Sequence, residues 1–590
     1  MKTTTICDLV AKMPQRNSNK PALLFKKDST WQKLSWPEYY AEIESVGVGL
    51  LTIGAQVGDT IAIMSNTRLE WSTADHAIAA IHGVVVPIYQ TVTPDDLAFI
   101  LNNSKVKIIF IENKNILKSF NQIKNHCPSV QHVISFDGEF EDVLSWQSLK
   151  DQGLAKNSEL RPIFEKLIQS TQLEQTATIL YTSGTTGQPK GVVLTHRQII
   201  SEVSEAFPQM GATSADTSLS FLPYAHIMGR IENWGHIHTG FTMAFAESID
   251  KVKTNMIEVQ PTFMIAVPRI FEKIYTSIVA GMEANRFKSR LFKWAINVGK
   301  AASEYQINRE PIPAYLLAEL ILAKKLVLNK VKDAFGGKIR FCVSGGAPLS
   351  KDIAMFFHAC EILILEGYGL TETTAAICIN TPYDYRFGSV GKPIGDVQLK
   401  IAEDGEILVK SDKVMKEYYQ DSESSAAAFT AGWFHTGDIG EILSSGDLKI
   451  TDRKKDLIKT GGGKYVAPQR LENLLKMTPV ISNSLIHGDQ KKYIVALITL
   501  DKPNVLRFAK DHNLEYEDFA TLTQHPTVLE LVRKAVAEAN SHLASFESIK
   551  RFAILPMDFT VEAGELTPSL KVKRKVLDQK YRKQIDSLYS

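Results

Sequence analysis

The sequence predicts an α/β protein with a large N-terminal domain of doubly wound sheets, a β-rich subdomain and a small C-terminal α+β domain. Short β-rich runs such as "VVVPI" (84–88), "KIIFIE" (107–112) and "IRFCVSGG" (339–346) alternate with longer helical patterns. That alternation is typical of sheets covered by helices on both faces. After about residue 395 the pattern changes to short alternating strands and tight turns, and a charged connector, "DRKKD" (452–456), precedes the last stretch.

These changes of pattern define the expected domains. We expect an N-terminal domain over 1–451, with the β-rich subdomain at about 395–451, and a C-terminal domain over 452–590. Within the subdomain, Asp404-Gly405 and Ser445-Gly446 are hairpin signals. No internal repeat is evident.

The overall composition excludes several classes of protein. The chain has 590 residues, is 44% apolar and carries a formal net charge of +2. A dedicated nucleic-acid binder normally shows a basic surplus on one domain, so that class is disfavoured. The five cysteines are odd in number and lack metal-ligand spacing, which fits a reducing cytoplasm better than a disulfide scaffold. The opening "MKTTTICDLV" is too polar for a signal peptide.

Two neighbouring segments raise the question of membrane contact. "NRFKSRLFKWAINVGK" (285–300) mixes basic with large apolar residues, a pattern that could lie on an acidic membrane surface. The favoured interpretation is a surface helix whose apolar stripe packs on the core. "AYLLAELILA" (314–323) is an amphipathic helix candidate, because Glu319 interrupts it and two lysines follow it. Peripheral contact with the inner membrane surface through 285–331 is kept as an alternative.

The stretch "YTSGTTGQPKG" (181–191) has the composition of a phosphate-binding loop. Glycines let backbone N–H groups turn toward an anion, the hydroxyl side chains add donors, and Lys190 adds a positive charge. It is not the common P-loop of kinases and GTPases, because Pro189 stands where that motif requires glycine. A flexible linker is the alternative. The β-branched runs "TATIL" and "VVL" on either side favour a turn between two strands instead.

Four further stretches suggest a nucleotide site. "SGGAPLS" (344–350) and "EGYGLTETT" (366–374) each follow a strand, so their backbones and a tyrosine ring could frame a flat base. Glu372 in the second stretch offers a carboxylate for Mg²⁺. "WFHTGDIG" (433–440) isolates Asp438 between turns, where it could accept both ribose hydroxyls, and Arg453 lies beside the charged connector. Together with the loop at 181–191, they offer sites for base, ribose, metal and phosphate.

With these motifs the chain resembles the adenylate-forming, AMP-binding superfamily, and within it the long-chain fatty acid:CoA ligases (acyl-CoA synthetases). The loop at 181–191 matches that family's phosphate loop, "YGLTET" its adenine and magnesium motif, and "TGD" its ribose motif. "DRKKDLIK" matches its hinge and "LTPSLKVKRKV" (566–576) its C-terminal lysine motif. All five occur in family order. Each alone would be a weak signal, whereas five in order are a strong one.

The resemblance implies a two-step reaction. A fatty acid carboxylate attacks the α-phosphorus of ATP and expels pyrophosphate, and the thiol of CoA then attacks the acyl-adenylate and expels AMP. Mg²⁺ is the implied cofactor, and ATP and CoA are co-substrates. A mobile C-terminal domain serves both steps, with a hinge near Lys455. Because negative charge gathers on the phosphates in the first step, the site needs cations and fixed hydrogen-bond donors.

The resemblance also assigns roles to individual residues. The expected phosphate contacts are Thr182, Ser183, Gly184, Thr185, Thr186 and Lys190. The expected adenine wall is Gly346, Ala347, Pro348, Glu366, Gly367 and Tyr368, with Asp438 and Arg453 at the ribose. The expected catalytic residues are Thr371 at the α-phosphate, Glu372 holding Mg²⁺, His226 near the acyl carboxylate, Lys459 in the thioester step and Lys571 bridging carboxylate and α-phosphate.

Some of these assignments have structural alternatives. His226 in "LPYAHIMGR" could be a buried structural histidine, and Glu372 could complement a helix N-terminus. Lys571 could belong to a solvated basic tail, since three basic residues follow it closely, although its spacing from Thr567 and Ser569 favours catalysis. The chain departs from the family after the hinge, where three glycines (461–463) replace the usual triplet. The alignment there stays open.

Two rival functions share these motifs. The first is an acyl-adenylate ligase that loads the thiol of a carrier protein instead of CoA. The second is a non-catalytic acyl-nucleotide sensor that has kept the fold and lost turnover. The charged positions named above are all present, which favours an active enzyme, while acyl chain length cannot be derived from the residues.

Overall fold

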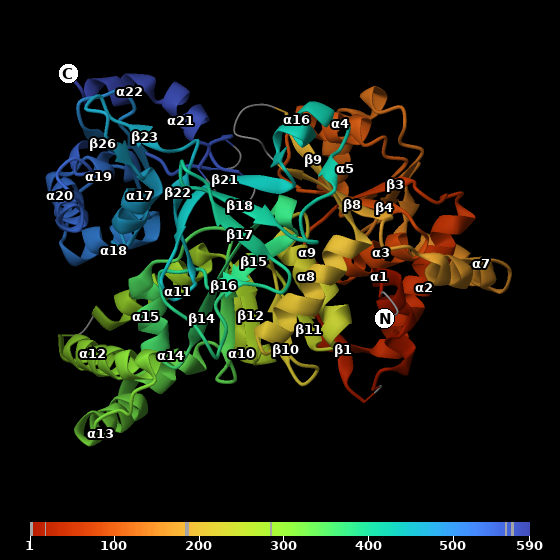
Figure 1. Ribbon diagram of the computed structural model, residues 1–590, viewed down its shortest axis with the longest axis horizontal. Helices are drawn as coiled ribbons and strands as arrows, with labels where there is room; N and C mark the ends of the chain where they lie inside the picture. The colour runs from red at the N-terminus through yellow and green to blue at the C-terminus, as the bar shows by residue number, and fades with distance from the viewer. Residues whose placement is uncertain (1–3, 18, 183–187, 284–285, 561–562, 568–571) are drawn as a thin grey trace.

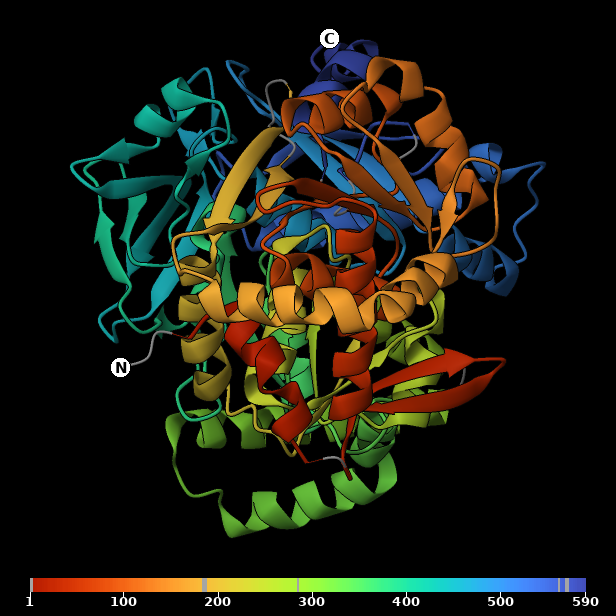
Figure 2. The same cartoon turned by 90° about the vertical axis from the view of Figure 1, so that its right-hand side faces the viewer.

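The structure is a computed structural model that describes residues 4–17, 19–182, 188–283, 286–560, 563–567 and 572–590. Two large sheets form the body of the molecule, a β-rich part lies beside them, and the C-terminal residues form a separate lobe (Figure 1). Viewed from the side, the β-rich part and the body are distinct masses (Figure 2). The expected alternation of strands and helices is therefore observed.

The first large sheet has eight strands in the order β19-β9-β8-β4-β3-β5-β6-β7. Its strands are β3 (Thr60–Met64), β4 (Val84–Ile88), β5 (Ile108–Ile111), β6 (His132–Ser135), β7 (Leu144–Ser145), β8 (Thr176–Thr182), β9 (Lys190–Thr195) and β19 (Glu417–Tyr418). Strands β3 to β8 pair in parallel, whereas β9 and β19 add antiparallel pairs at one edge. The segments flanking the sequence 183–189 are thus paired strands, which confirms the expected strand-to-strand turn.

Both faces of this sheet are buried. Ile61 and Ile63 of β3 join the large core, while Ala62 and Met64 join a second cluster on the other face. This alternation follows from the two-residue period of a strand. The helices around the sheet are α2 (Trp36–Thr52), α3 (Leu69–Ala80), α4 (Pro94–Asn103), α5 (Lys114–Asn121), α6 (Trp146–Ala155) and α7 (Asn157–Ser170). Helices α4 and α5 supply the second cluster, so helices cover the two faces as expected.

The second large sheet has nine strands in the order β16-β15-β14-β13-β12-β10-β11-β1-β2. They are β1 (Pro21–Lys27), β2 (Thr30–Ser35), β10 (Thr217–Ser220), β11 (Thr242–Phe245), β12 (Phe263–Ala266), β13 (Phe341–Ser344), β14 (Leu363–Leu370), β15 (Ala375–Ile379) and β16 (Lys392–Pro393). The helices in this half are α1 (Ile6–Ala11), α8 (His196–Gln209), α9 (Ile227–Thr239), α10 (Val252–Val259), α11 (Pro268–Glu283), α12 (Arg286–Asn308) and α15 (Lys351–Ala359). The strands pair in parallel in the centre of this sheet and antiparallel at its two ends.

The β-rich part forms a third sheet of five strands. They are β17 (Gln398–Ile401), β18 (Glu406–Lys410), β20 (Phe429–Thr430), β21 (Trp433–Ile442) and β22 (Leu448–Arg453). Asp404-Gly405 turns between β17 and β18, and Ser445-Gly446 turns between β21 and β22, as the sequence predicts. One strand of this stretch, β19, instead pairs with β9 of the first large sheet. That pairing ties the β-rich part to the strand that begins at Lys190.

The C-terminal lobe has its own hydrophobic clusters. Its strands are β23 (Ile458–Lys459), β24 (Tyr465–Val466), β25 (Ile481–His487), β26 (Ile494–Leu500) and β27 (Ile549–Ile554). Its helices are α17 (Pro468–Lys476), α18 (Lys502–Asp511), α19 (Phe519–Thr523), α20 (Pro526–Ser541), α21 (Arg574–Lys580) and α22 (Arg582–Ser587). The lobe touches the body where Arg269 of α11 donates hydrogen bonds of 3.0 Å to the carbonyl and the hydroxyl of Ser482.

The fold class is therefore confirmed: a large α/β part, a β-rich part and an α+β C-terminal part. In the described residues, the last apolar side chain packed on the large core is Ile450, and the C-terminal clusters begin at Ile458. The residue boundaries and the hinge remain predictions. None of the helices in the described part of the chain combines the length and the apolar character needed to cross a membrane.

The apolar residues of helix α12 bear on whether the segment 285–300 packs on the core or faces a membrane. Phe292 is buried, with its ring 6.1 Å from that of Phe356, and Ala295 and Ile296 are buried beside it. The basic amphipathic pattern of this helix therefore packs its apolar stripe on the core, which confirms the favoured interpretation.

A buried carboxylate in α9 makes stability depend on pH. Glu232 is fully buried, and its Oε2 accepts a hydrogen bond of 2.8 Å from Ser220. Burial raises its pKa to about 7. A folded-state pKa above the unfolded value means that the native protein binds the extra proton, so stability falls as pH rises from about 4.5 to about 7.

We predict that Glu232→Gln removes this loss, because glutamine resembles the protonated acid. The variant should gain up to about 3 kcal/mol of unfolding free energy relative to the parent between pH 4.5 and pH 8. Urea unfolding at a series of pH values measures this difference. The exposed Glu304→Gln is the matched control and should show no such trend. A constant difference between Glu232→Gln and the parent across the series would contradict the prediction.

Candidate active site

Three residues expected at the nucleotide come together around one buried carboxylate. Tyr368 of β14 donates a hydrogen bond of 2.7 Å to Oδ2 of Asp438 in β21. Arg453 of β22 lies opposite Asp438 in the strand pairing, with its Nε 3.1 Å from Oδ1. Burial, and then the charge of Asp438, raises the pKa of Tyr368 well above its usual range. The phenol therefore stays protonated and donates.

The turn before Asp438 is fixed by its own contacts. Gly437 has φ +70°, a conformation that glycine adopts without strain, and its N–H donates to Glu406 at 2.9 Å. The hydroxyl of Thr436 accepts from the N–H of Asp438 at 3.1 Å. Lys454 holds Glu406 with an ion pair of 2.9 Å. The backbone of the "TGD" motif is thus held by Glu406 of β18, which is itself paired with Lys454 of the connector.

A second group joins Glu372, expected at the metal, with Lys190 of the phosphate loop. The link is Tyr418 of β19, whose hydroxyl donates to Oε1 of Glu372 at 2.9 Å. The Lys190 ammonium lies 5.2 Å from the centre of the same tyrosine ring and 3.8 Å from Oδ2 of Asp421. An ammonium over an aromatic face is attracted by the ring quadrupole. Tyr418 thus contacts two of the expected site residues, and the motifs did not identify it.

The backbone around Glu372 is held by a buried ion pair. The Lys413 ammonium, which is fully buried, lies 3.2 Å from Glu202 and 2.6 Å from Glu205, both on α8. Glu202 accepts the N–H of Ala376 at 3.0 Å, and the hydroxyl of Thr374 donates to the Lys413 carbonyl at 2.6 Å. The segment after Glu372 is therefore fixed on two sides. The sequence gives no signal for this, since an isolated lysine is usually solvated.

Two loops approach each other on the proposed adenine side. Gly346 adopts φ +79°, and a Cβ there would come within 3.4 Å of Met228 Sδ. A Cβ on the neighbouring Gly345 would meet both Met228 and the Gly367 carbonyl. The segments of His226, of Gly346 to Pro348 and of Gly367 therefore pack together. Met228, which connects them, was not identified from the sequence.

Glu366 has a structural contact in the same place. Its carboxylate is buried and accepts the N–H of Leu349 at 3.2 Å, which fastens the Ala347-Pro348 turn to β14. Burial raises its pKa to about 7. This contact positions the expected adenine wall.

His226 caps the N-terminus of α9. Its Nδ1 accepts the N–H of Met228 at 3.2 Å, and the residue is half-buried. N-capping satisfies one of the orphan donors at the helix start. A role of His226 toward an acyl carboxylate stays a prediction.

The hinge region places Lys459 on the C-terminal side of the connector. Lys459 lies in β23, paired with β24, and its ammonium is 5.7 Å from the Tyr465 ring. Lys455 is exposed in the turn between β22 and β23. The N–H of Lys454 donates to the Gly437 carbonyl at 2.9 Å, and those of Asp456 and Leu457 donate to the Arg453 carbonyl at 2.9 and 3.1 Å. Lys455 therefore lies inside a hydrogen-bonded turn at the end of β22.

Several predicted residues lie outside the described part of the chain. They are Ser183, Gly184, Thr185, Thr186 and Lys571. The two ends of the phosphate loop are described, since Thr182 pairs with Lys190 across β8 and β9. Thr371 opens a short turn of helix, Thr371–Thr373, directly before the segment held by Lys413.

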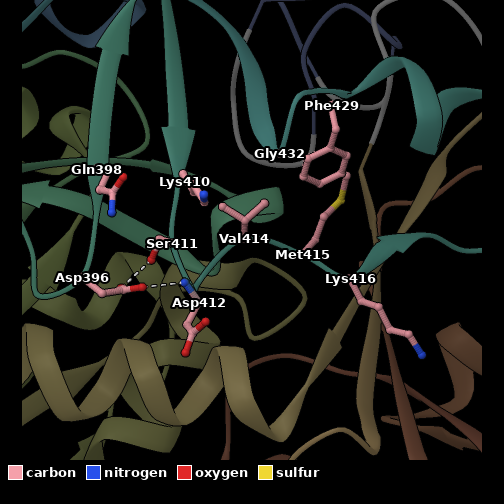
Figure 3. Close-up of a pocket in the computed structure, with 10 residues that line it drawn as sticks. All are labelled: Asp396, Gln398, Lys410, Ser411, Asp412, Val414, Met415, Lys416, Phe429 and Gly432. Atoms are coloured by element: carbon pink, nitrogen blue, oxygen red, sulfur yellow. Dashed lines mark hydrogen bonds between the residues drawn. The ribbon is translucent and has the colours of Figure 1, made fainter.

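A cavity of about 410 Å³ lies in the β-rich part (Figure 3). In it Asp396 accepts hydrogen bonds from the Ser411 hydroxyl and from the N–H of Asp412 (Figure 3). None of the predicted site residues lines it. It adjoins them through Met415, which lines the cavity and donates its N–H to the Glu372 carbonyl at 2.7 Å.

The carboxylates near the proposed site fit an Mg²⁺ ion that is bound partly by the protein and partly by a nucleotide. Among the described residues, no group of three or more His, Cys, Asp or Glu side chains could enclose a metal ion. Glu372 offers one carboxylate whose Oε1 is already oriented by Tyr418. Mg²⁺ commonly binds through one or two carboxylates together with substrate phosphates, so this arrangement fits a metal that arrives with a nucleotide.

The fold and these groups define an α/β enzyme that binds a nucleotide beside a smaller C-terminal domain. The comparisons make this specific. Residues 10–419 match the model of the AMP-binding enzyme family, and residues 455–590 match that of the AMP-binding enzyme C-terminal domain. The chain therefore belongs to the AMP-binding enzymes, within the group of the long-chain fatty acid–CoA ligases.

Two relatives illustrate that group. A long-chain-fatty-acid–CoA ligase of Mycobacterium bovis is 35% identical, over 95% of this chain and 93% of its own length. The peroxisomal long chain acyl-CoA synthetase 7 of Arabidopsis thaliana is 33% identical, over 96% of this chain and 83% of its own. The family resemblance inferred from the motifs is confirmed.

Solved structures show the same fold. The adenylation domain of a carboxylate reductase from Mycobacterium chelonae has a TM-score of 0.77 at 20% identity, covering all of this chain and 92% of its own. A fatty acyl CoA synthetase from Mycobacterium tuberculosis has a TM-score of 0.63 at 21% identity, covering 98% and 99%.

We predict that Tyr418→Phe weakens the binding of ATP in the presence of Mg²⁺ by about tenfold, because Glu372 loses the hydrogen bond that orients it. The aromatic ring under Lys190 remains. Titration calorimetry with ATP, at low and at saturating Mg²⁺, measures the effect.

The adjacent Tyr419→Phe is the matched control, since it removes a hydroxyl that does not contact Glu372. Equal affinities for the parent and Tyr418→Phe, at every Mg²⁺ concentration, would show that the tyrosine has no part in holding this carboxylate.

Proposed function

We propose that the protein activates a long-chain fatty acid with ATP to an acyl-adenylate and transfers the acyl group to CoA, releasing pyrophosphate and then AMP. The observation that carries this proposal is the Tyr368–Asp438–Arg453 cluster in a chain that belongs to the AMP-binding family. The relatives named above are ligases of long-chain fatty acids and CoA, which supports the choice of substrates.

In the first step a poor acylating agent becomes a good one. The leaving group of a carboxylate would be oxide, whereas that of an acyl-adenylate is AMP. Asp438 and Arg453 hold the ribose, with the base against Tyr368. Lys190 and the loop hydroxyls of Thr182, Ser183, Thr185 and Thr186 neutralise the departing pyrophosphate.

Two residues face the reacting atoms. Thr371 donates toward the α-phosphate, and Lys571 bridges the attacking carboxylate and the same phosphate. Glu372 is the residue that would hold Mg²⁺, which when bound withdraws charge from the phosphate oxygens. His226 acts on the side of the acyl carboxylate.

The second step uses another arrangement of the C-terminal domain. A single small domain cannot present Lys571 in the first step and Lys459 in the second from one fixed position. Rotation at Lys455 exchanges the two faces. The gap between the large core and the C-terminal clusters, from Ile450 to Ile458, supports a hinge there, because rotation would break neither core.

One assay tests the function and its rivals together. Pyrophosphate release is measured with ATP, Mg²⁺ and a panel of carboxylates of increasing chain length, with CoA, with a phosphopantetheine-bearing carrier protein, or with neither. We expect release that depends on a long-chain acid, and thioester formation with CoA. Thioester on the carrier alone would identify a carrier-loading ligase, and binding without release would identify a sensor.

We predict that Lys571→Ala lowers acyl-adenylate formation by at least about a hundredfold while leaving the thioester step from supplied acyl-adenylate within about threefold. Pyrophosphate exchange measures the first and CoA-dependent consumption of acyl-adenylate the second. Lys575→Ala, an exposed lysine on α21, is the matched control and should affect neither. Equal losses in both steps would point to misfolding or to a misassigned lysine.

Lys455→Pro should separate the half-reactions, preserving one and losing the other. Proline fixes φ near −65° and removes an N–H, so it traps one orientation of the domain. Lys455→Ala removes the same side chain without restricting the backbone, and it should retain both steps. The same two assays apply. If both rates of the proline variant stay within about threefold of the parent, under 1 kcal/mol in barrier, the connector is not a functional hinge.

A further inference from the structure

Arg230 of α9 is a charged side chain in the interior of the large α/β part, where charges are rare. It is 1% exposed, and its guanidinium donates a hydrogen bond of 2.7 Å to Oδ1 of Asp75 in α3, which is also buried. The rings of Trp71 and Trp234 lie 5.1 and 4.4 Å from the guanidinium carbon. Taking two charges out of water is costly, and apolar residues of similar volume often stabilise a core equally well. Stability alone therefore does not account for this pair.

Two further contacts join the α3 side to the chain at the start of α9. Thr67, just before α3, donates its hydroxyl to the Leu222 carbonyl at 2.6 Å. The ring of Trp71 packs edge-on against that of Tyr224, with 5.0 Å between their centres. Trp71 and Asp75 are one turn apart on α3, so they lie on the same face of that helix. The ion pair is thus the last of three contacts along one seam between α3 and α9.

His226 lies within the span of these contacts. It follows Tyr224 by two residues and precedes Arg230 by one helical turn, and the N–H of Arg230 donates to the His226 carbonyl at 3.1 Å. The preceding loop packs tightly on this turn, since a Cβ at Gly229 would lie 2.6 Å from the Pro223 carbonyl oxygen. Because a packed helical turn is a rigid element, a shift of Arg230 would shift His226 with it.

The same guanidinium reaches the strand that leads into the phosphate loop. Its Nη1 donates to the hydroxyl of Thr178 at 3.3 Å, and that hydroxyl donates to the Val85 carbonyl at 2.7 Å. Thr178 lies in β8, four residues before Thr182 at the end of that strand. Arg230 therefore contacts both α3 and β8 from α9. The planar fork of a guanidinium can make several such directed hydrogen bonds at once.

We propose that Arg230, held by Asp75, is a positioning residue for acyl-adenylate formation, because it fixes His226, on the side of the acyl carboxylate, relative to β8 and the phosphate loop. The inference rests on the proposed function, in which that carboxylate reacts with the nucleotide. Holding reactants in the reactive geometry supplies a large part of an enzyme's rate enhancement, and a displacement of about 1 Å can cost about a hundredfold in rate. The pair is thus expected to act on the rate of the first step.

The test removes the pair without leaving one charge unpaired. Asp75→Asn combined with Arg230→Met removes both charges and keeps similar side-chain volumes. We expect the kcat of pyrophosphate release, at saturating ATP, Mg²⁺ and long-chain acid, to fall by about tenfold or more. The Kd for ATP, measured by titration calorimetry, should stay within about threefold of the parent. Arg230→Lys keeps a charge for Asp75 but lacks the planar fork, so its kcat should lie between those of the parent and the double variant.

The matched control is Asp216→Asn combined with Arg340→Met. These two residues form an ion pair of the same length, 2.7 Å, whose arginine is more exposed. They lie directly before β10 and β13, at the opposite end of the sheet from the carboxyl ends of those strands. The control should keep the parent's kcat even where its melting temperature falls.

Each outcome decides the proposal. A folded Asp75→Asn, Arg230→Met protein with the parent's kcat would overturn it, and so would an equal loss of kcat in the control. If the double variant does not fold, Arg230→Lys decides. A kcat of this variant within about threefold of the parent would overturn the proposal, and a lower kcat with unchanged affinity for ATP would support it. A parent that releases no pyrophosphate with any acid would instead contradict the proposed function, and this inference with it.

Discussion

The buried carboxylate of Asp438 lies where three parts of the chain meet. Because it is buried, it needs the partners that the other two parts supply. An unpaired buried charge is strongly destabilising, by about 3–5 kcal/mol when a partner is removed. Tyr368 reaches it from the nine-stranded sheet and Arg453 from the last strand before the connector. The group proposed to bind the ribose therefore also fixes the β-rich part against the body. An Asp438 variant would lose both functions at once.

The buried ammonium of Lys413 imposes a second constraint of the same kind. It draws the loop that precedes β19 onto α8 and so fixes the segment after Glu372. Because β19 then pairs with β9, Tyr418 contacts both Glu372 and Lys190. The proposed metal carboxylate and the phosphate lysine thus depend on residues from the β-rich stretch, about 200 residues beyond the phosphate loop.

The motifs could be found in the sequence because each is local. Glycines, a turn and a charged residue within ten positions define the sites of Asp438 and Glu372, and the runs around 181–191 predict the β8–β9 pair. Tyr418, Lys413 and Met228 could not be found in this way. Each acts through a contact made over a long sequence separation, and "MKEYY" has no local pattern that tells a site tyrosine from a core one. The apolar residues of α13 (Ala314–Ala323) likewise predict burial until the fold shows that only one side has a partner.

The position of Arg453 bears on how a hinge could work in this chain. Its strand pairing with Asp438 belongs to the β-rich sheet, and beyond Lys455 the backbone bonds to that sheet include those from Asp456 and Leu457 to the Arg453 carbonyl. A rotation at Lys455 would leave the Tyr368–Asp438–Arg453 contacts proposed for the ribose intact, while Lys459 and Lys571 both follow the proposed pivot in the sequence. The Arg269–Ser482 contact would have to break, but it joins a guanidinium to neutral oxygens and no buried ion pair. The nucleotide could therefore stay bound while the catalytic face changes, which the proposed reactions require, because the first is an attack on the α-phosphorus and the second an attack on the acyl carbonyl that expels AMP.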